Sequence, residues 1–272
     1  MTLAEVLRGA TGYLAARGVP SPRVDAEHLL AHALDLKRID LYTQHDRPLT
    51  EAERNAVREL VRRRGRREPL AYVLGEWGFR RLVLKTDARA LVPRPETEVV
   101  VDRCLELLAG IPAPRVLDVG TGSGALALAI AQEHPGSVVT ATDASPDALA
   151  LARENADRLD VGVTFVEGDL LAGEAGPFDL VASNPPYVPA AEIEALEPEV
   201  RDWEPRAALL DEGQTERLAS EARAALHGWL VLEIHEHRAR AVSATLERLG
   251  YHDVAVAPDL AGRPRVVSGR WS

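Results

Sequence analysis

The chain has 272 residues, of which 46% are hydrophobic and 27% charged, so it is neither disordered, collagen-like nor a disulfide scaffold. Its formal net charge of −10 argues against a surface that binds nucleic acid throughout. The single cysteine, Cys104, excludes an intrachain disulfide, and the scattered histidines offer no zinc-binding spacing. We expect Cys104 to lie in the core and no metal to be bound.

No apolar run approaches the roughly 20 residues that a membrane-spanning helix needs, and the acid-containing N-terminus is unlike a signal peptide. We therefore expect a cytoplasmic protein that makes no membrane contact. Residues 1–75 hold 13 Lys and Arg against 10 Asp and Glu, whereas the rest of the chain holds 19 against 32.

The first 75 residues are predicted to form a small helical domain. The pairs Thr2/Glu5 and Thr50/Glu53 have the spacing of a capping box. Pro22 marks another helix start, because proline at the first helical position loses no hydrogen bond. Each start precedes apolar residues spaced three and four apart, which share one helical face.

Residues 76–92 are predicted to form a β-hairpin that links two domains. Aromatic and branched side chains are frequent there, and Thr86-Asp87 is the expected turn. A helix is then expected from Pro95 to about Leu108.

From residue 114 onward, short apolar runs alternate with amphipathic stretches. The predicted strands are residues 115–119, 137–143, 161–167, 178–183, 229–234, 253–257 and 265–269, with helices between the first five. This alternation is typical of a mostly parallel sheet covered by helices on both faces. The predicted fold class is therefore α/β, with a seven-stranded sheet in residues 93–272.

The first predicted strand runs into a glycine-rich turn made of Gly120, Thr121, Gly122, Ser123 and Gly124. Glycines let the backbone approach a ligand closely, and the helix start that follows attracts an anionic group. Alone, such a turn is a weak signal.

Acidic residues end the next two strands. Asp143 is placed to accept hydrogen bonds from ribose hydroxyls, and Asp169 to meet an adenine amino group while Leu170 packs on the ring. Helix capping would explain one such aspartate. Acids at successive strand ends beside a glycine loop favour a nucleoside site, for either a dinucleotide or S-adenosylmethionine.

The fourth strand is followed by Asn184-Pro185-Pro186-Tyr187. Two prolines stiffen the chain and remove two donors, which leaves the Asn184 side-chain oxygen and the Pro185 carbonyl as acceptors. Two acceptors suit a planar NH2 group, and Tyr187 can lie against the group that carries it. These residues predict methyl transfer to an amide-like nitrogen, aided by orientation rather than by a strong base. A rigid structural turn is the alternative.

This combination resembles S-adenosylmethionine-dependent methyltransferases that modify amino groups, which include DNA amino-methylases and protein glutamine methyltransferases. Residues 67–76 with Phe79, residues 91–98 and residues 259–267 resemble segments of the peptide chain release factor glutamine methyltransferase family. The resemblance covers nearly the whole chain. It implies a Rossmann-like class I methyltransferase domain, S-adenosyl-L-methionine as cofactor, and methylation of the glutamine in the GGQ motif of release factors.

The resemblance also implies roles for individual residues. The implied cofactor-binding residues are Gly120, Thr121, Gly122, Ser123, Gly124, Asp143, Asp169, Leu170 and Asn184. The implied substrate-binding residues are Asn184, Pro185, Pro186, Tyr187, Arg94, Glu96 and Thr97, of which Asn184, Pro185 and Tyr187 are catalytic. A structural ion pair is an equal alternative for Arg94 and Glu96. The implied partner is a release factor, met by the helical domain of a monomer that holds no nucleic acid stably.

Two positions depart from the family pattern: His235 replaces a glycine, and Asp211-Glu212 stands where a glycine pair is common. Two other functions stay open. One is a glutamine methyltransferase acting on a ribosomal protein. The other, a DNA amino-methyltransferase, is disfavoured because the motif region is acidic and only 85 residues follow Tyr187. The arginine run of residues 58–67 is more typical of a solvated helix face than of a phosphate grip.

Overall fold

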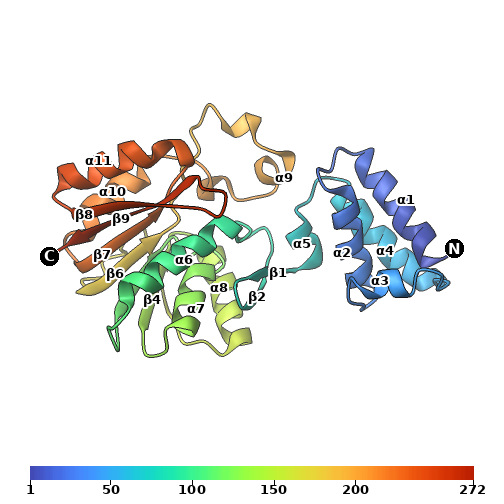
Figure 1. Cartoon of the computed structure of the whole chain (residues 1–272), viewed down its shortest axis with the longest axis horizontal. Helices are drawn as coiled ribbons and strands as arrows, with labels where there is room; N and C mark the ends of the chain where they lie inside the picture. Colours follow the sequence, from blue (N-terminus) through green and yellow to red (C-terminus); the bar gives the residue numbers. More distant parts are fainter. The chain divides into compact units, whose positions relative to one another are not determined.

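The computed structural model describes residues 1–272, and the chain divides into two compact units (Figure 1). The helical unit comprises Met1–Glu76 with Glu197–Trp203, and the sheet unit comprises Trp77–Leu196 with Glu204–Ser272. None of the helices combines the length and the apolar character that crossing a bilayer requires.

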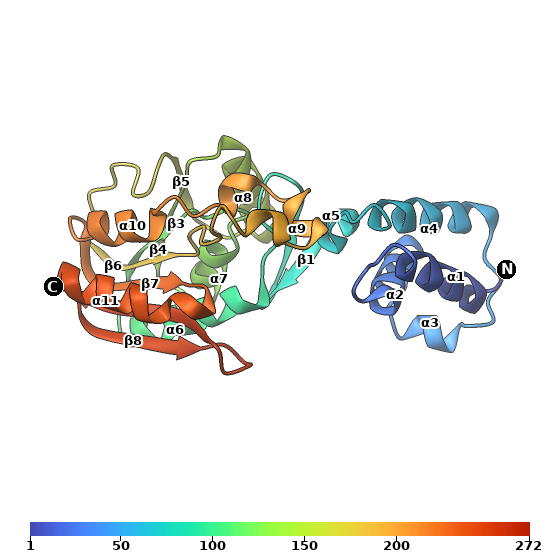
Figure 2. The ribbon, with the colours of Figure 1, turned by 90° about the horizontal axis from the view of Figure 1, so that it is seen from above.

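The helical unit contains α1 (Leu3–Ala15), α2 (Pro22–Ala33), α3 (Asp40–Thr43), α4 (Glu51–Arg64), α5 (Leu70–Leu74) and α9 (Pro198–Arg201). Both predicted capping boxes form at the starts of α1 and α4, and Pro22 opens α2. Figure 2 shows α4 running alongside α1 and α2. Leu14, Leu29 and Leu30 are fully buried between these helices, so burial of their apolar faces holds the unit together.

The arginine run at the end of α4 is not a uniformly solvated face, which corrects the sequence-based interpretation. Tertiary folding brings carboxylates close to this run from α2, from the segment just before α5 and from the start of α9. These carboxylates neutralise part of its positive charge. Its internal ion pairs are Arg63 with Glu68, Arg64 with Asp25 and Glu199, and Arg67 with Glu197 and Glu199.

The hairpin consists of β1 (Glu76–Phe79) and β2 (Leu82–Lys85). Its turn lies at Arg80-Arg81, where Arg80 has a φ of 52°, so the predicted turn at Thr86-Asp87 was wrong. The Arg80 backbone N–H donates to Glu98 at 2.9 Å, and its guanidinium donates to Glu133 at 2.5 Å and 2.8 Å. These carboxylates anchor the turn. Because they are distant in the sequence, the residues of the turn alone do not reveal its position.

The sheet contains β3 (Arg115–Val119), β4 (Val138–Asp143), β5 (Thr164–Glu167), β6 (Phe178–Ser183), β7 (Leu226–Glu233), β8 (His252–Pro258) and β9 (Pro264–Trp271). Its order is β5-β4-β3-β6-β7-β9-β8, and β9 alone runs antiparallel to the other six strands. The seven-stranded, mostly parallel sheet confirms the predicted fold class.

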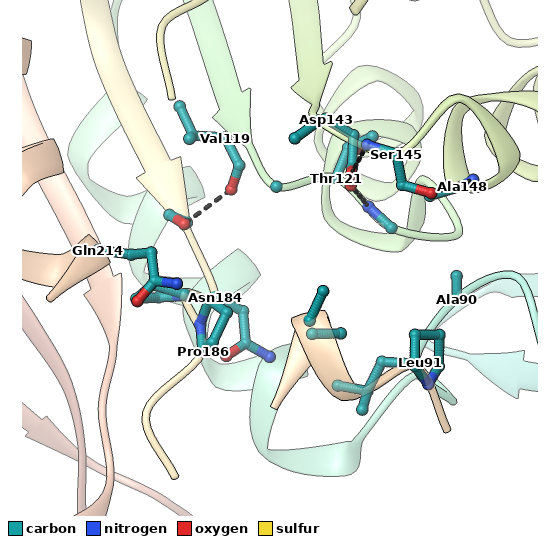
Figure 3. A pocket seen from close by; sticks show the side chains of 18 of the residues that line it. Ala90, Leu91, Val119, Thr121, Asp143, Ser145, Ala148, Asn184, Pro186 and Gln214 are labelled. Carbon is teal, nitrogen blue, oxygen red and sulfur yellow. Dashed lines mark hydrogen bonds between the residues drawn. The ribbon is translucent and has the colours of Figure 1, made fainter. Parts of the chain in front are cut away.

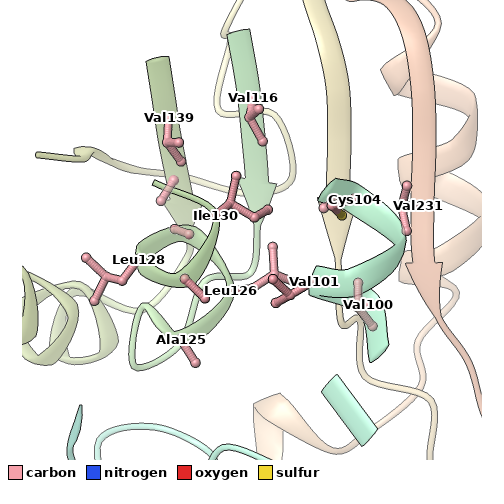
Figure 4. Packing of buried hydrophobic residues seen from close by; sticks show 14 of the residues in the cluster. Val100, Val101, Cys104, Val116, Ala125, Leu126, Leu128, Ile130, Val139 and Val231 are labelled. Atoms are coloured by element: carbon pink, nitrogen blue, oxygen red, sulfur yellow. The ribbon is translucent and has the colours of Figure 1, made fainter. Parts of the chain in front are cut away.

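Helices cover both faces of this sheet. They are α6 (Pro95–Leu108), α7 (Ala125–Glu133), α8 (Pro146–Leu159), α10 (Gln214–Ala222) and α11 (Ala239–Leu249). Successive β6 residues alternate: Leu180 packs in the cluster with α6 and α7, and Val181 in the cluster with α10 and α11. Figure 4 shows the first cluster, where Cys104 of α6 is fully buried as predicted.

Short turns of 3-10 helix complete the sheet unit at η1 (Ile193–Ala195), η2 (Arg206–Ala208) and η3 (Glu236–Arg238). The helix predicted between β5 and β6 does not form. Gly168, Gly173 and the Gly176-Pro177 pair interrupt that connection, and such residues disfavour a helix interior.

The strand order reverses between β3 and β6, because the chain leaves β3 toward β4 on one side and returns to β6 on the other. Loops at the carboxyl ends of two such strands diverge and leave a crevice for a ligand. Val119 is the register partner of Ser183, so Gly120 and Asn184 begin neighbouring loops.

Candidate active site

A cavity of about 740 Å³ lies at the carboxyl ends of β3, β4 and β6 in the sheet unit (Figure 3). Its volume suits a small organic ligand. The predicted site residues that line it are Gly120, Thr121, Gly122, Ser123, Asp143, Asp169, Leu170, Asn184, Pro185, Pro186, Arg94 and Thr97. Gly124, Glu96 and Tyr187 are not among its lining residues.

The glycine loop bonds inward rather than toward the cavity. The N–H groups of Gly120 and Thr121 both donate to the Thr142 carbonyl at 2.9 Å. The Gly122 N–H donates to Asp143 Oδ2 at 2.8 Å. An anion would have to displace these bonds, so the N–H groups of Gly120, Thr121 and Gly122 are not free to bind a pyrophosphate.

Gly124 serves packing instead of lining the cavity as expected. Its φ is 85°, and a Cβ there would lie 3.0 Å from Leu128 Cδ1 and 3.3 Å from Ala152 Cβ. Glycine at this position therefore lets the start of α7 approach α8, which holds the loop in place.

Asp118 lies beneath the glycine loop and was not singled out from the sequence. It is 1% exposed and accepts hydrogen bonds from Thr121 Oγ1 at 2.7 Å and from the Ala127 N–H at 3.2 Å. Burial raises the pKa of Asp118 to about 7, although both hydrogen bonds oppose this. The available signal was an acid inside an otherwise apolar strand.

Asp143 joins the loop after β3 to the start of α8, as Figure 3 shows. Its Oδ2 accepts from the Gly122 N–H and its Oδ1 accepts from the Ser145 N–H at 2.9 Å. Burial raises the pKa of Asp143, and these backbone hydrogen bonds oppose the rise. Each carboxylate oxygen keeps a further lone pair, so Asp143 can still accept from two ligand hydroxyls.

The loop after β5 contributes two residues, of which Leu170 is buried and Asp169 is exposed. Leu170 is buried with a φ of 48°, and its carbonyl accepts from Thr142 Oγ1 at 2.7 Å. A bulky residue in this left-handed region is strained, and such strain is typical of binding sites. Asp169 is exposed and its carboxylate forms an ion pair with Arg217 of α10, which water competes with.

The Asn184-Pro185-Pro186-Tyr187 segment is fixed at both ends. Asn184 Nδ2 donates to Thr97 Oγ1 at 3.3 Å, and Thr97 Oγ1 donates to Glu233 Oε2 at 2.7 Å. The Tyr187 hydroxyl donates to Glu233 Oε1 at 3.4 Å. Burial of Tyr187 and the nearby Glu233 charge raise the pKa of its hydroxyl.

Glu233, at the end of β7, is the second site residue that sequence reasoning missed. It is 1% exposed, and burial raises its pKa to about 7 despite its hydrogen bonds. A charged residue closing a buried strand was the signal that could have found it.

Arg94 and Glu96 both form ion pairs, though not with each other. Arg94 Nη2 donates to the two carboxylate oxygens of Glu204 at 2.7 Å and 2.6 Å, and Glu204 is only 6% exposed. Arg94 nevertheless lines the cavity. Glu96 lies outside the cavity, and its Oε1 is 3.8 Å from Arg263 Nη2.

The positions that depart from the family pattern are accommodated locally. The His235 ring lies 6.1 Å from the Tyr187 ring, outside the cavity. Asp211 accepts from the Gly213 N–H at 2.9 Å and from Arg238 at 2.8 Å, and Gly213 has a φ of 84° before α10.

The cavity thus joins an end lined by the glycine loop, Asp143 and Leu170 to an acceptor-rich end at Asn184 and Pro185. Asp118, Asp143 and the inward-bonded loop favour a neutral or cationic ligand over a pyrophosphate. At the other end, the Asn184 side-chain oxygen accepts no hydrogen bond from the protein. This oxygen and the Pro185 carbonyl can therefore hold a donor group of a second substrate.

Comparison with known proteins agrees with this geometry. A family model described as the PrmC N-terminal domain matches residues 5–75, and one described as the methyltransferase small domain matches residues 100–197. The crystal structure of a methyltransferase from Pyrococcus furiosus has a TM-score of 0.53 at 21% identity, covering 70% of this chain and 88% of that one. This likeness shows the shared class I methyltransferase fold.

Two relatives match along almost their whole length. The release factor glutamine methyltransferase of Deinococcus radiodurans is 46% identical, with 99% of both chains covered. That of Geobacter sulfurreducens is 42% identical over 99% of this chain and 96% of the relative. The chain therefore belongs to the release factor glutamine methyltransferase family, whose members use S-adenosyl-L-methionine.

Proposed function

We propose that the protein transfers a methyl group from S-adenosyl-L-methionine to the side-chain amide nitrogen of the glutamine in the GGQ motif of a release factor. The observation that carries this proposal is the unbonded Asn184 oxygen beside the Pro185 carbonyl, in the lining of the cavity of about 740 Å³ that also contains the glycine loop and Asp143. Full-length similarity to release factor glutamine methyltransferases supports it.

The residues at the nucleoside end fit S-adenosyl-L-methionine. Asp143 has lone pairs for the ribose hydroxyls, Leu170 offers an apolar wall, and Asp169 can leave its exposed ion pair to meet the adenine. Asn184 borders the same space. When bound, the cofactor supplies an electrophilic methyl group on a positively charged sulfur.

The acceptor end addresses the weak nucleophilicity of an amide. The lone pair of an amide nitrogen is delocalised into its carbonyl, so the nitrogen attacks poorly. Two acceptors, Asn184 Oδ1 and the Pro185 carbonyl, hold both hydrogens of the NH2 group and stabilise the positive charge that develops on them. As the nitrogen–carbon bond forms and the carbon–sulfur bond breaks, one of these protons is released to water.

Arg94 and Thr97 also line the cavity. Arg94 is paired with the buried Glu204, so it adds no unpaired positive charge to the lining. Thr97 contacts Asn184 directly.

The partner is proposed to bind partly through the helical unit, whose first 75 residues carry an excess of three positive charges in an acidic protein. Every residue lining the cavity belongs to the sheet unit of one chain. This supports a monomer, and we place the reaction in the cytoplasm, where release factors act.

The experiment uses labelled S-adenosylmethionine with four separate acceptors: a full-length release factor, the same factor with its GGQ glutamine replaced by alanine, ribosomal protein, and duplex DNA. Mass spectrometry then maps the methyl group. We expect one methyl on the GGQ glutamine and none on the alanine control. Methylation of ribosomal protein or DNA without methylation of the release factor would contradict the proposal.

A further inference from the structure

A chain of hydrogen bonds joins three elements behind the acceptor end of the cavity. It runs from Asn184, after β6, through Thr97 of α6 to Glu233 at the end of β7. Thr97 is 6% exposed and Glu233 is 1% exposed, so water does not compete freely for these bonds.

The ionised carboxylate gives this chain a direction. Glu233 can only accept, so the single hydroxyl hydrogen of Thr97 points to it at 2.7 Å. Thr97 then has only lone pairs left for Asn184. The amide of Asn184 must turn its NH2 group toward Thr97, which leaves Oδ1 for a substrate.

We propose that Glu233 is a positioning residue that acts through Thr97. It keeps the oxygen of the Asn184 amide, rather than its NH2 group, available to the side-chain amide of the substrate glutamine. This inference rests on the proposed function. The amide of an asparagine is nearly symmetric in shape, so packing alone selects its orientation weakly, and hydrogen-bond polarity must decide it.

Protonation of Glu233 removes this selection. A protonated carboxyl can donate to Thr97, which frees the Thr97 hydrogen to donate to Asn184 Oδ1. The Asn184 amide can then rotate, and its NH2 group faces the NH2 group of the substrate. Two donor groups repel each other, so the amide of the substrate glutamine is no longer held.

The same carboxylate also accepts from the Tyr187 hydroxyl at 3.4 Å through its other oxygen. Glu233 therefore contacts the last residue of the Asn-Pro-Pro-Tyr segment directly and the first one through Thr97. One ionised group thereby fixes both ends of the loop that carries the acceptors.

Charged neighbours from each side tune the protonation of Glu233. Burial raises its pKa to about 7, Glu96 of α6 adds to the rise, and Arg265 of β9 and the hydroxyls of Thr97 and Tyr187 oppose it. The ionised, orienting form is therefore lost as the pH falls through about 7.

The kinetic test compares full-length variants acting on a full-length release factor between about pH 5.5 and pH 8.5, the range around the titration. We expect Thr97→Val to lower kcat by about 10- to 100-fold and to flatten its acid limb, and Thr97→Ser to restore most of the rate and the limb. Glu233→Gln, which can donate as well as accept, should also lose rate and the limb. KM changes less, since release factor contacts elsewhere persist.

Thr164→Val is the matched control, because Thr164 begins β5 in the sheet unit, at the end of that strand opposite to the cavity-lining residues. It should leave kcat and its pH profile unchanged. Calorimetric affinity for S-adenosylmethionine should also be unchanged in the Thr97 and Glu233 variants, which separates orientation of Asn184 from damage to the cofactor site.

A spectroscopic readout tests the relay without any turnover. The side-chain NH2 resonances of Asn184, assigned by their absence in Asn184→Asp, should shift with pH at a midpoint near 7 in the wild-type protein. They should not titrate there in Glu233→Gln. The inference would be overturned if Thr97→Val kept the wild-type rate and pH profile. It would also be overturned if the Asn184 resonances showed the same pH dependence in the wild type and in Glu233→Gln. A wild-type enzyme that leaves the GGQ glutamine unmethylated, with the titration intact, would instead contradict only the proposed function.

Discussion

Ser183 Oγ donates a hydrogen bond to the Val119 carbonyl oxygen at 2.7 Å, between two residues that are also register partners of β6 and β3. This bond is buried and joins the last residues of the two strands. The glycine loop and the Asn-Pro-Pro-Tyr segment begin immediately after it. The cofactor end and the acceptor end of the cavity are therefore held at a fixed separation by the centre of the sheet (Figure 3).

Asn184→Ala should abolish most methyl transfer while sparing cofactor binding. The change removes one of two acceptors for the glutamine NH2 group, and losing one preorganised polar group lowers kcat by about 100- to 1000-fold. Affinity for S-adenosylmethionine, measured by calorimetry, should stay within about threefold, because Asp143, and not Asn184, is the proposed acceptor for the ribose hydroxyls. A large loss of affinity would show that Asn184 serves the cofactor instead.

Asp143→Ala should weaken S-adenosylmethionine binding. The carboxylate both anchors the Gly122 N–H and offers lone pairs to the ribose, and a lost charge-assisted hydrogen bond costs about 1.5–3 kcal/mol. We expect at least a tenfold higher dissociation constant. Asp147→Ala, an exposed aspartate in the first turn of α8, is the matched control and should bind as the wild type does. Equal affinities of the two variants would rule out the role given to Asp143.

Gly124→Ala should destabilise the sheet unit more than Gly110→Ala. Both glycines have positive φ, at 85° and 87°, so both substitutions carry the strain of about 1 kcal/mol for a left-handed alanine. Only at Gly124 would the new Cβ crowd Leu128 and Ala152, which adds about 1–3 kcal/mol of overpacking. Urea denaturation of each variant measures the difference. Equal losses would mean that α7 and α8 have room to move apart.

The helical unit should lose stability in acid through Glu27. This carboxylate is 3% exposed; burial raises its pKa, but hydrogen bonds from Arg23, Arg38 and Tyr42 outweigh burial and lower it to about 2. Because the folded pKa lies below the ordinary value of 4.5, the stabilisation is present above pH 4.5 and is lost as the pH falls toward 2. The loss is about 3 kcal/mol.

Hydrogen exchange of the α2 amides, measured between about pH 2.5 and pH 6, reports this change locally. The wild-type protein should lose protection free energy over that range. Glu27→Gln should start lower and lose less, since it has no carboxylate to protonate. Parallel curves for the two proteins would exclude Glu27 as the source.

Local signals in the sequence were reliable where short-range hydrogen bonds decide the structure. The capping boxes of Thr2 and Thr50 form because donor and acceptor are three residues apart. The same holds for Pro22 at the start of α2 and for the strands that carry the glycine loop and Asn184. The hairpin turn was mispredicted because the distant carboxylates of Glu98 and Glu133 anchor it at Arg80. The helix predicted after β5 was wrong because several glycines interrupt that connection.

By itself, the sequence determined the fold class and the two loops that meet in the cavity, because apolar periodicity and glycine and proline act within a few residues. Only the tertiary structure decided which side chains support those loops. Thr97 and Glu233 are 136 residues apart, and Arg94 and Glu204 are 110 apart. Their hydrogen bonds depend on burial and on the tertiary contact of segments that are distant in the chain, so no spacing along the chain could reveal them.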